Sequence, residues 1–244
     1  MRTVLTVITL VLYFLITFPF SVLLFLLRKV NRKLSSRISQ AFVRNGFRCV
    51  MWVAGMKRTV LGLENVPKDR PVLFAANHKS IIDAPLGYIT LPVLTGFVSK
   101  KEIAKVPFLH LWMLNTNCLF LDRQDIKAGM KTILTCIDYI KDGYSIFIAP
   151  EGTRSHTEEP LPFKDGSLKP ASKTGCPIIP VAITGTDDLF ENNNKRIHKA
   201  HVIIEYGKPI DLASLSEEDR KHPGEYVRGV VMQMLEKQKT MLSK

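Results

Sequence analysis

The sequence predicts an α/β protein in which one domain, residues 56–244, carries a mostly parallel sheet of about seven strands flanked by helices. Two observations predict the sheet: apolar runs recur along this part of the chain, and they alternate with helix-like stretches such as 126–140 and 226–242. A third observation sets residues 1–55 apart, because a long uncharged run there is followed by a basic stretch. The apolar runs lie near Val60, Val72, Leu94, Leu119, Ile146, Ile179 and Val202.

The beginning of the chain predicts a membrane anchor. No charged side chain occurs from Thr3 to Leu27, and a helix of that length can cross or deeply enter a hydrocarbon core of about 30 Å. Pro19 is expected to kink this helix. The alternative is a cleaved signal peptide, but the apolar stretch is longer than a usual signal core and no clear small-x-small cleavage site follows. We therefore expect a retained anchor.

The next segment predicts a basic amphipathic helix that lies on anionic lipid. Ten of the 34 Lys and Arg residues precede Glu64, the first acidic residue, and they supply most of the net charge of +12. This asymmetry predicts that the rest of the chain lies on the cytoplasmic side, and we expect a bacterial cytoplasmic membrane. The alternative is a soluble helix with its polar face in water. Nucleic-acid binding is disfavoured because the cations adjoin a long apolar run and no DNA- or RNA-binding signature is present.

A histidine and a carboxylate follow the apolar run around Val72. This run reads as a buried strand, and a helix can open near Ile81, so His78 falls on a strand-to-helix turn. Asp83 can hold one ring nitrogen of His78 and leave the other free to accept a proton. Residues five apart on a regular helix point about 140° apart, so the pair can meet only if His78 precedes the helix. The alternative is a turn histidine beside a helix-start carboxylate.

The apolar run around Ile146 ends in a second polar turn, which contains Glu151, Gly152, Thr153 and Arg154. Ligands of parallel sheets bind outside the carboxyl ends of the strands, so the two turns are expected to share one crevice. Gly152 permits close backbone approach, Thr153 offers a hydroxyl donor, and Arg154 offers a planar fork for a phosphate. The alternative is an ordinary turn with a solvated arginine.

Together with other segments, these residues resemble the family of glycerolipid acyltransferases that includes 1-acylglycerol-3-phosphate acyltransferase. The resemblance covers roughly residues 60–207. Two positions depart from the pattern: Asn117 stands where Gly is usual, and Ala149 stands where an aromatic residue often occurs. Because Asn tolerates positive φ, the turn at Asn117 can survive. The matching motifs are His78-x4-Asp83, Phe120-Leu121-Asp122-Arg123, Pro150 to Ser155, Phe163-Lys164-Asp165-Gly166, and Ile179-Pro180-Val181.

The resemblance implies transfer of a fatty acyl group from acyl-CoA or acyl-acyl-carrier protein to the free hydroxyl of lysophosphatidate, forming phosphatidate in phospholipid biosynthesis. His78 would be the general base, oriented by Asp83, and neither a covalent acyl-enzyme nor a bound cofactor is needed. Ser80 is expected to cap a helix, because no Gly-x-Ser-x-Gly elbow surrounds it. The expected substrate-binding residues are Arg123, Arg154, Gly152, Thr153 and Glu151, with Lys100 and Lys164 as weaker candidates. The alternative for the two lysines is that they are simply solvated.

Several alternatives stay open at this point. The acceptor could be another lysophospholipid or glycerol 3-phosphate, water could replace it in a lipid hydrolase, or the chain could be a non-catalytic membrane adaptor. No metal site is expected, since the histidines and carboxylates form no recognised ligand set. The cysteines, which lack paired spacing, are expected to be structural or free: Cys49, Cys118, Cys136 and Cys176.

Overall fold

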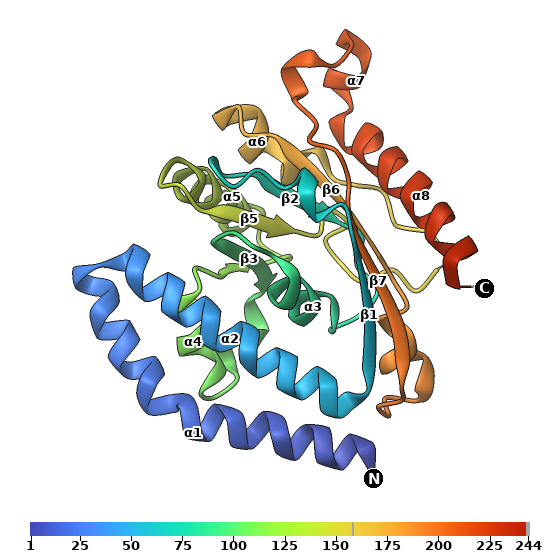
Figure 1. Cartoon of the computed structure of the whole chain (residues 1–244). Coiled ribbons are helices and arrows are strands. Elements are labelled where there is room, and N and C mark those ends of the chain that lie inside the picture. Colours follow the sequence, from blue (N-terminus) through green and yellow to red (C-terminus); the bar gives the residue numbers. More distant parts are fainter. Residues whose placement is uncertain (158, 243–244) are drawn as a thin grey trace.

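A computed structural model describes residues 1–157 and 159–242 (Figure 1). It begins with two long helices, α1 (Arg2–Val30) and α2 (Arg32–Ala54), packed side by side. The Asn31 side chain starts α2 by accepting a hydrogen bond from the amide of Leu34 at 3.0 Å. Pro19 lies inside α1, and Figure 1 shows that α1 bends about midway along its length. The bend is expected because proline removes one backbone hydrogen bond and crowds the preceding turn.

Seven strands form one sheet in the order β1-β7-β6-β2-β5-β3-β4. All neighbouring pairs are parallel except β6 with β7, which is antiparallel. The predicted mostly parallel, seven-stranded sheet is therefore confirmed, and each of the seven apolar runs overlaps or adjoins one strand. The strands are β1 (Met56–Leu61), β2 (Leu73–Ala76), β3 (Thr95–Lys100), β4 (Leu119–Leu121), β5 (Ser145–Ile148), β6 (Ile178–Thr184) and β7 (Ala200–Tyr206).

Helices cover both faces of the sheet, so its central strands are buried on both sides. Alternate side chains of β2 enter two different cores: Phe74 and Ala76 pack on the face toward α2 and α3, and Leu73 and Ala75 on the face toward α5, α6 and α8. This explains why β2 reads as a continuous apolar run. The remaining helices are α3 (Asp83–Thr90), α4 (Leu109–Asn115), α5 (Ile126–Lys141), α6 (Lys169–Thr174), α7 (Glu217–Lys221) and α8 (Pro223–Leu242).

Asn117 joins the helix pair to the sheet. Its φ is 58°, so it adopts the left-handed conformation that Asn, unlike most residues, tolerates. Its side-chain oxygen accepts hydrogen bonds from Arg28 and Arg32, and its amide donates to Ser36. The Arg28 guanidinium also donates to the carbonyl of Leu114 at 2.6 Å. The N-terminal helices are thus held to the α/β body by buried polar contacts.

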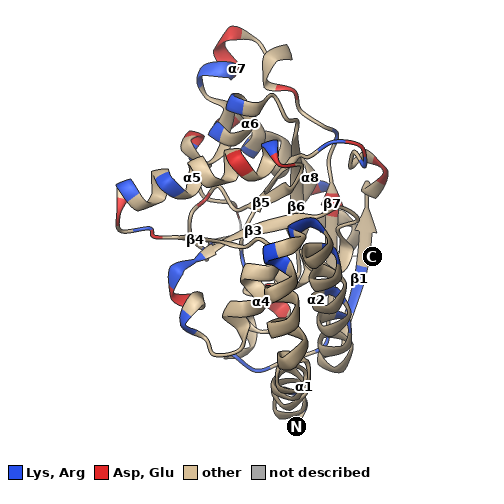
Figure 2. Cartoon of the chain, turned by 90° about the vertical axis from the view of Figure 1, so that its left-hand side faces the viewer, with Lys and Arg blue, Asp and Glu red and all other residues tan. Residues whose placement is uncertain are grey.

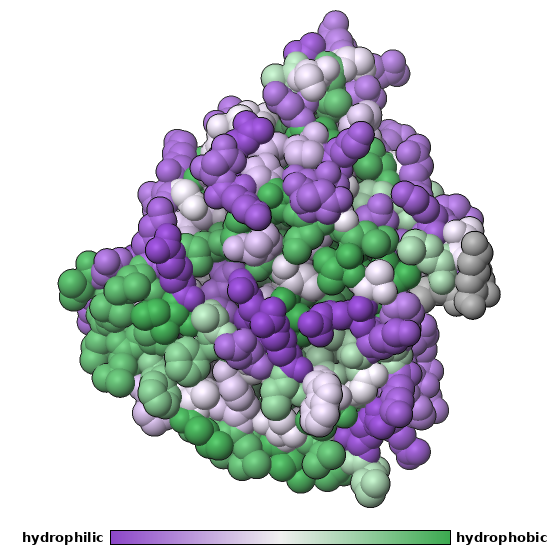
Figure 3. Space-filling model, viewed as in Figure 1, coloured by the Kyte–Doolittle hydropathy of each residue, from purple (hydrophilic) through white to green (hydrophobic). Residues whose placement is uncertain are grey.

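The outward face of α1 is apolar over almost its whole length. Within the described residues, α1 is the one helix long and apolar enough to cross a membrane, and 17% of its most apolar window is buried. Figure 3 shows this surface as a continuous green belt, and Figure 2 shows no charged residue along the middle of α1. Such a belt on a soluble surface would be unusually large, which supports association of α1 with a membrane.

Candidate active site

Four adjacent strands, β2, β5, β3 and β4, deliver polar residues to one edge of the sheet. A cavity of about 930 Å³ opens there, at the carboxyl ends of these strands. The two polar turns predicted to share a crevice do so, because β2 and β5 are direct neighbours. The predicted residues that line the cavity are His78, Asp83, Lys100, Arg123, Gly152, Thr153, Arg154 and Lys164.

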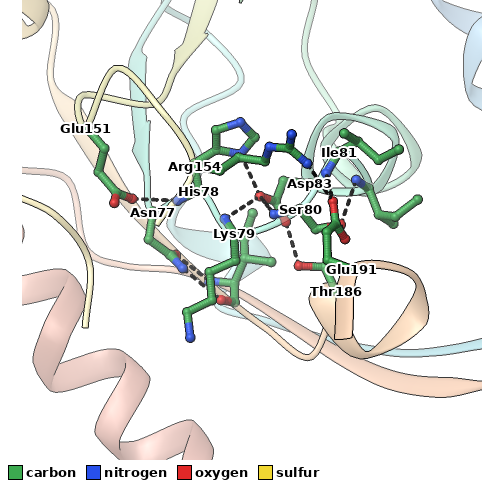
Figure 4. A network of polar contacts seen from close by, with 12 residues as sticks. Asn77, His78, Lys79, Ser80, Ile81, Asp83, Glu151, Arg154, Thr186 and Glu191 are labelled. Atoms are coloured by element: carbon green, nitrogen blue, oxygen red, sulfur yellow. Dashed lines mark hydrogen bonds and ion pairs between the residues drawn. The ribbon is translucent and has the colours of Figure 1, made fainter. Parts of the chain in front are cut away.

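His78 and Asp83 are in direct contact, with 2.8 Å between the Nδ1 and Oδ2 atoms (Figure 4). The contact is possible because α3 begins at Asp83, two residues later than Ile81, which leaves His78 in the preceding turn. The same Oδ2 atom accepts hydrogen bonds from the amides of Lys79 and Ser80 at 2.9 and 3.0 Å. Facing a carboxylate, Nδ1 carries the proton, and Nε2 is left as the acceptor.

Asp83 is buried, with 3% of its surface exposed, and its second oxygen is also bonded. Thr186, which follows β6, donates its hydroxyl to Oδ1 of Asp83 at 2.6 Å. The carboxylate lies in the first turn of α3, where the helix dipole favours negative charge. The position of the Asp83 carboxylate is therefore fixed before any ligand arrives.

The backbone of His78 is held by the turn that follows β5. One Glu151 oxygen accepts the His78 amide at 2.6 Å, and the other accepts the Leu161 amide at 2.7 Å. The His78 carbonyl accepts the amide of Ser155 at 2.8 Å. Burial raises the pKa of Glu151, while these two amides act in the opposite direction. Both oxygens of Glu151 face the backbone, so its contacts in this structure position the His78 turn and do not reach an arginine or the cavity wall.

Arg154 extends into the cavity and pairs with Glu191, with 2.9 Å between its Nη1 atom and Oε1 of Glu191. Glu191 also accepts hydrogen bonds from the Ser80 hydroxyl at 2.7 Å and from the amide of Ile81 at 2.9 Å. This carboxylate therefore joins the arginine to the turn that carries His78 (Figure 4). A guanidinium has five N–H donors, so most of the donors of Arg154 stay available to a ligand.

Arg123 lies near Arg154, at the end of β4. Burial lowers the pKa of Arg123, the Glu102 carboxylate opposes that shift, and the neighbouring Arg154 adds to it. Two arginines that interact in this way create a strongly positive region in the cavity. Lys100 is half-exposed and lies 3.5 Å from Glu102, so its charge is partly compensated within its own loop.

Gly152 is required by its backbone conformation and by its surroundings. Its φ is 75°, and a Cβ atom at this position would lie 2.9 Å from the Nζ atom of Lys164. Glycine therefore lets Lys164 lie against the turn. Ser80 is fully buried, and its hydroxyl accepts the amide of Ile82 at 3.0 Å while donating to Glu191. Its hydroxyl is thus engaged in local structure. The expected helix cap is not formed, because α3 begins at Asp83, its N-cap position is occupied by Ile82, and no side chain caps it.

The sequence did not single out Asn77, Thr186 or Glu191. The Asn77 side chain bonds both the amide and the carbonyl of Ile183 and so fastens the end of β2 to β6. Each of the three residues contacts a partner more than 100 positions away: Asn77 bonds Ile183, Thr186 bonds Asp83, and Glu191 bonds Ser80. Glu191 adjoins a run of asparagines that reads as an ordinary exposed loop, and no local pattern marks it as a partner of Arg154.

One wall of the cavity is apolar and comes mainly from α5. Its side chains recur every three or four residues, so they face the cavity from one side of the helix. Three of these side chains, Ile126, Met130 and Leu134, are exposed, and an open apolar wall of this kind is suited to contact a hydrocarbon chain. Within the described residues no group of His, Cys, Asp and Glu side chains could hold a metal ion. The α5 residues on this wall are Ile126, Met130, Ile133, Leu134 and Ile137.

Comparison with known proteins gives consistent matches. A model of the family described as Acyltransferase matches residues 57–184. The 1-acyl-sn-glycerol-3-phosphate acyltransferase of Borreliella burgdorferi is 30% identical over 200 residues, which are 82% of this chain and 80% of that protein. The enzyme of the same name from Cocos nucifera is 32% identical over 199 residues, and this chain spans 64% of its length.

A solved structure is also similar over nearly the whole chain. It is the 1-acyl-sn-glycerophosphate (LPA) acyltransferase PlsC from Thermotoga maritima, with a TM-score of 0.76 and 28% identity. The match covers 98% of both chains, so it includes the N-terminal helix pair as well as the sheet.

Proposed function

The chain belongs to the acyltransferase family, and from this premise we propose that it transfers a fatty acyl group from an acyl thioester to the free hydroxyl of 1-acyl-sn-glycerol 3-phosphate. The product would be phosphatidate, a precursor in phospholipid biosynthesis. One observation carries the proposal: His78 meets a buried, fully bonded carboxylate at the polar end of a cavity whose other wall is apolar. The cavity thus combines an oriented base with room for a hydrocarbon chain.

The proposed reaction is a direct transfer. The acceptor hydroxyl oxygen attacks the thioester carbonyl carbon while Nε2 of His78 removes the hydroxyl proton. Asp83 holds the ring through Nδ1 and balances the charge of the imidazolium that forms. When the tetrahedral intermediate collapses, the carbon–sulfur bond breaks, and the thiolate takes the proton from His78. A direct transfer agrees with the engagement of the Ser80 hydroxyl by Glu191 and Ile82.

The acceptor phosphate is proposed to bind Arg123 and Arg154, with Thr153 and the Gly152 turn beside them. Both guanidinium groups line the cavity that contains His78, and their mutual repulsion is relieved when a dianionic phosphate binds between them. Lys100 and Lys164 line the same cavity and would add to its positive potential. Glu151 would act on the substrate through the His78 turn that it holds.

The acyl donor is a thioester of coenzyme A or of acyl carrier protein. We propose that residues 1–55 form a membrane-anchoring unit and that residues 56–244 form the catalytic domain. The apolar belt of α1 and the cations beside it favour a site at the lipid surface, with the catalytic domain on the cytoplasmic side of a bacterial inner membrane. Both the acceptor and the product would then stay in the membrane.

The proposal is tested with the detergent-purified full chain, a labelled acyl thioester and lysophosphatidate, following phosphatidate and free fatty acid together. We expect His78→Ala to lower kcat by about 1,000-fold, because general-base help contributes roughly 10²–10⁴-fold. Lys79→Ala is the matched control, since the Lys79 side chain points away from His78 (Figure 4). It should retain near wild-type activity.

Other outcomes would contradict the proposal in specific ways. Release of fatty acid without phosphatidate would identify a hydrolase. Turnover of another lysophospholipid or of glycerol 3-phosphate alone would change the acceptor but keep the acyltransferase class. Equal activity in wild type and His78→Ala would remove the base from the mechanism.

A further inference from the structure

A second cavity lies at the amino ends of β2, β3 and β5, on the edge of the sheet opposite to the active site. Its volume is about 510 Å³, and it is lined by Pro71, Leu94 and Ser145, where these strands begin, and by one side of α2. Its charged side chains are strongly unbalanced, with five cations and one acid. They are Lys33, Arg37, Arg44, Lys68, Arg70 and Asp69.

The cations of this cavity form no ion pairs within the described residues. Throughout residues 1–157 and 159–242, none of its five cations lies within ion-pair distance of a carboxylate, whereas nearby Arg32 pairs with Asp142 at 3.3 Å. Excess cations around a concave surface favour the binding of an anion.

Arg44 is only partly satisfied in this cavity. One terminal nitrogen donates to the carbonyl of Leu91 at 2.7 Å, while Nε is buried and has no hydrogen-bond partner in the described part of the chain. Burial lowers the pKa of Arg44, and the neighbouring Arg48 adds to the shift. Because Nε is enclosed by the protein, the terminal nitrogens of Arg44 are the donors through which this side chain, which lines the cavity, would reach a ligand.

The cavity lies beside the part of the molecule that would contact lipid. Helices α1 and α2 pack against each other, and packed helices have axes 8–10 Å apart, so α2 lies about one helix diameter above the apolar belt. An interfacial helix buries its apolar face roughly 5–10 Å into the membrane, which brings groups at this height to the level of the headgroups. Figure 3 shows hydrophilic side chains over α2 next to the belt of α1.

From these observations we propose that the cavity binds the headgroup phosphate of an anionic phospholipid whose acyl chains remain in the bilayer beside α1. This site is separate from the phosphate site at Arg123 and Arg154, because it lies at the opposite ends of the strands. Arginine is suited to it, since the planar guanidinium forms paired hydrogen bonds with phosphate oxygens. The bound lipid would fix the tilt of the enzyme on the membrane.

Native mass spectrometry of the full chain can test this proposal by counting the lipids retained from neutral detergent micelles that contain a small fraction of phosphatidylglycerol. Such micelles carry little surface charge, so diffuse attraction contributes little. Wild type should retain one phosphatidylglycerol more than Arg37→Gln/Lys68→Gln, and the apparent Kd of that lipid should rise at least about tenfold in the variant. Both replaced side chains are exposed, so the fold should persist, and an unchanged melting temperature checks this.

The matched control is Lys29→Gln/Arg48→Gln, which removes the same charge from exposed positions of the helix pair outside the cavity. It should bind like wild type, and equal losses in the two variants would show diffuse attraction and overturn the site. Phosphatidylcholine should show no difference between wild type and the cavity variant. Displacement of the lipid by an equal concentration of inorganic phosphate would assign the cavity to a free anion, and no loss in the cavity variant would refute the proposal. None of these readouts depends on acyl transfer.

Discussion

The two edges of the sheet differ in whether their charged side chains have partners within the protein. At the carboxyl edge the carboxylates are bonded at every oxygen: Asp83 accepts four hydrogen bonds, Glu151 two and Glu191 three. At the amino edge, three cations of α2 and two from the loop before β2 line a cavity, and within the described residues none of them forms an ion pair with a carboxylate. Catalysis needs fixed geometry, which a saturated network provides. A surface that binds phosphate groups needs cations that are not already paired with carboxylates of the protein.

The strongest test of the saturated edge is Asp83→Asn, for which we expect kcat to fall by about 1,000-fold. The amide cannot accept hydrogen bonds at both of its terminal atoms, and its NH₂ group would favour the wrong tautomer of His78. The melting temperature, measured beside kcat, separates this effect from unfolding. A loss of kcat below about tenfold would show that Asp83 does not orient the base.

A smaller effect is expected for Glu151→Gln, about 30-fold in kcat with little change in KM. One end of the amide would present N–H to a backbone N–H of His78 or Leu161, so the turn would shift. The control is Glu159→Gln, which changes an exposed side chain of the same loop and should leave kcat nearly unchanged.

The raised pKa of Glu151 also predicts how stability depends on pH. The folded state holds the proton of the Glu151 carboxyl more tightly than the unfolded state, in which the pKa of this group is near 4.5. Between 4.5 and the raised value the folded protein therefore binds more protons, so its stability falls as pH rises, by at most about 1.4 kcal/mol per pH unit. Urea unfolding across this range should show that slope in wild type and lack it in Glu151→Gln. An identical slope in both proteins would assign the titration to other groups.

The smallest effects are expected at Asn117, which connects the helix pair to the sheet. Asn117→Gly should lower the free energy of unfolding by about 2 kcal/mol through loss of its bonds to Arg28, Arg32 and Ser36. Asn117→Ala should cost about 1 kcal/mol more, since its φ of 58° strains alanine, even after allowing for the greater entropy of glycine in the unfolded chain. The specific activity of folded protein should change little. A large loss of kcat in either variant would mean that the contacts of Asn117 at the amino edge of the sheet influence the active site at the carboxyl edge.

Much of the site could be predicted because its signals are local. The requirement that His78 precede a helix came from helical geometry alone, and α3 begins at Asp83. The shared crevice followed from the rule that ligands bind at the carboxyl ends of parallel strands. The departure at Asn117 was tolerated for the expected reason, a positive φ.

Glu151 shows where sequence reasoning stopped. Its place in a polar turn put it among the expected substrate-binding residues, and in the structure both of its oxygens accept hydrogen bonds from backbone amides. The ion pair of Arg154 is made by Glu191, a residue 37 positions away in a loop that carried no signal. Side-chain direction within a turn depends on which strands are neighbours, and this is not encoded in any single segment.

The sequence by itself determined the seven strands, the long uncharged helix at the start of the chain, the excess of cations before Glu64 and the pairing of His78 with Asp83. These features depend on composition, periodicity and spacing over a few residues. Only the tertiary structure decided the strand order, the contacts of Asn77, Thr186 and Glu191, and the basic cavity between α2 and the amino ends of the strands. Those contacts join segments that are distant along the chain, and they exist only because burying both faces of the sheet brings the segments together.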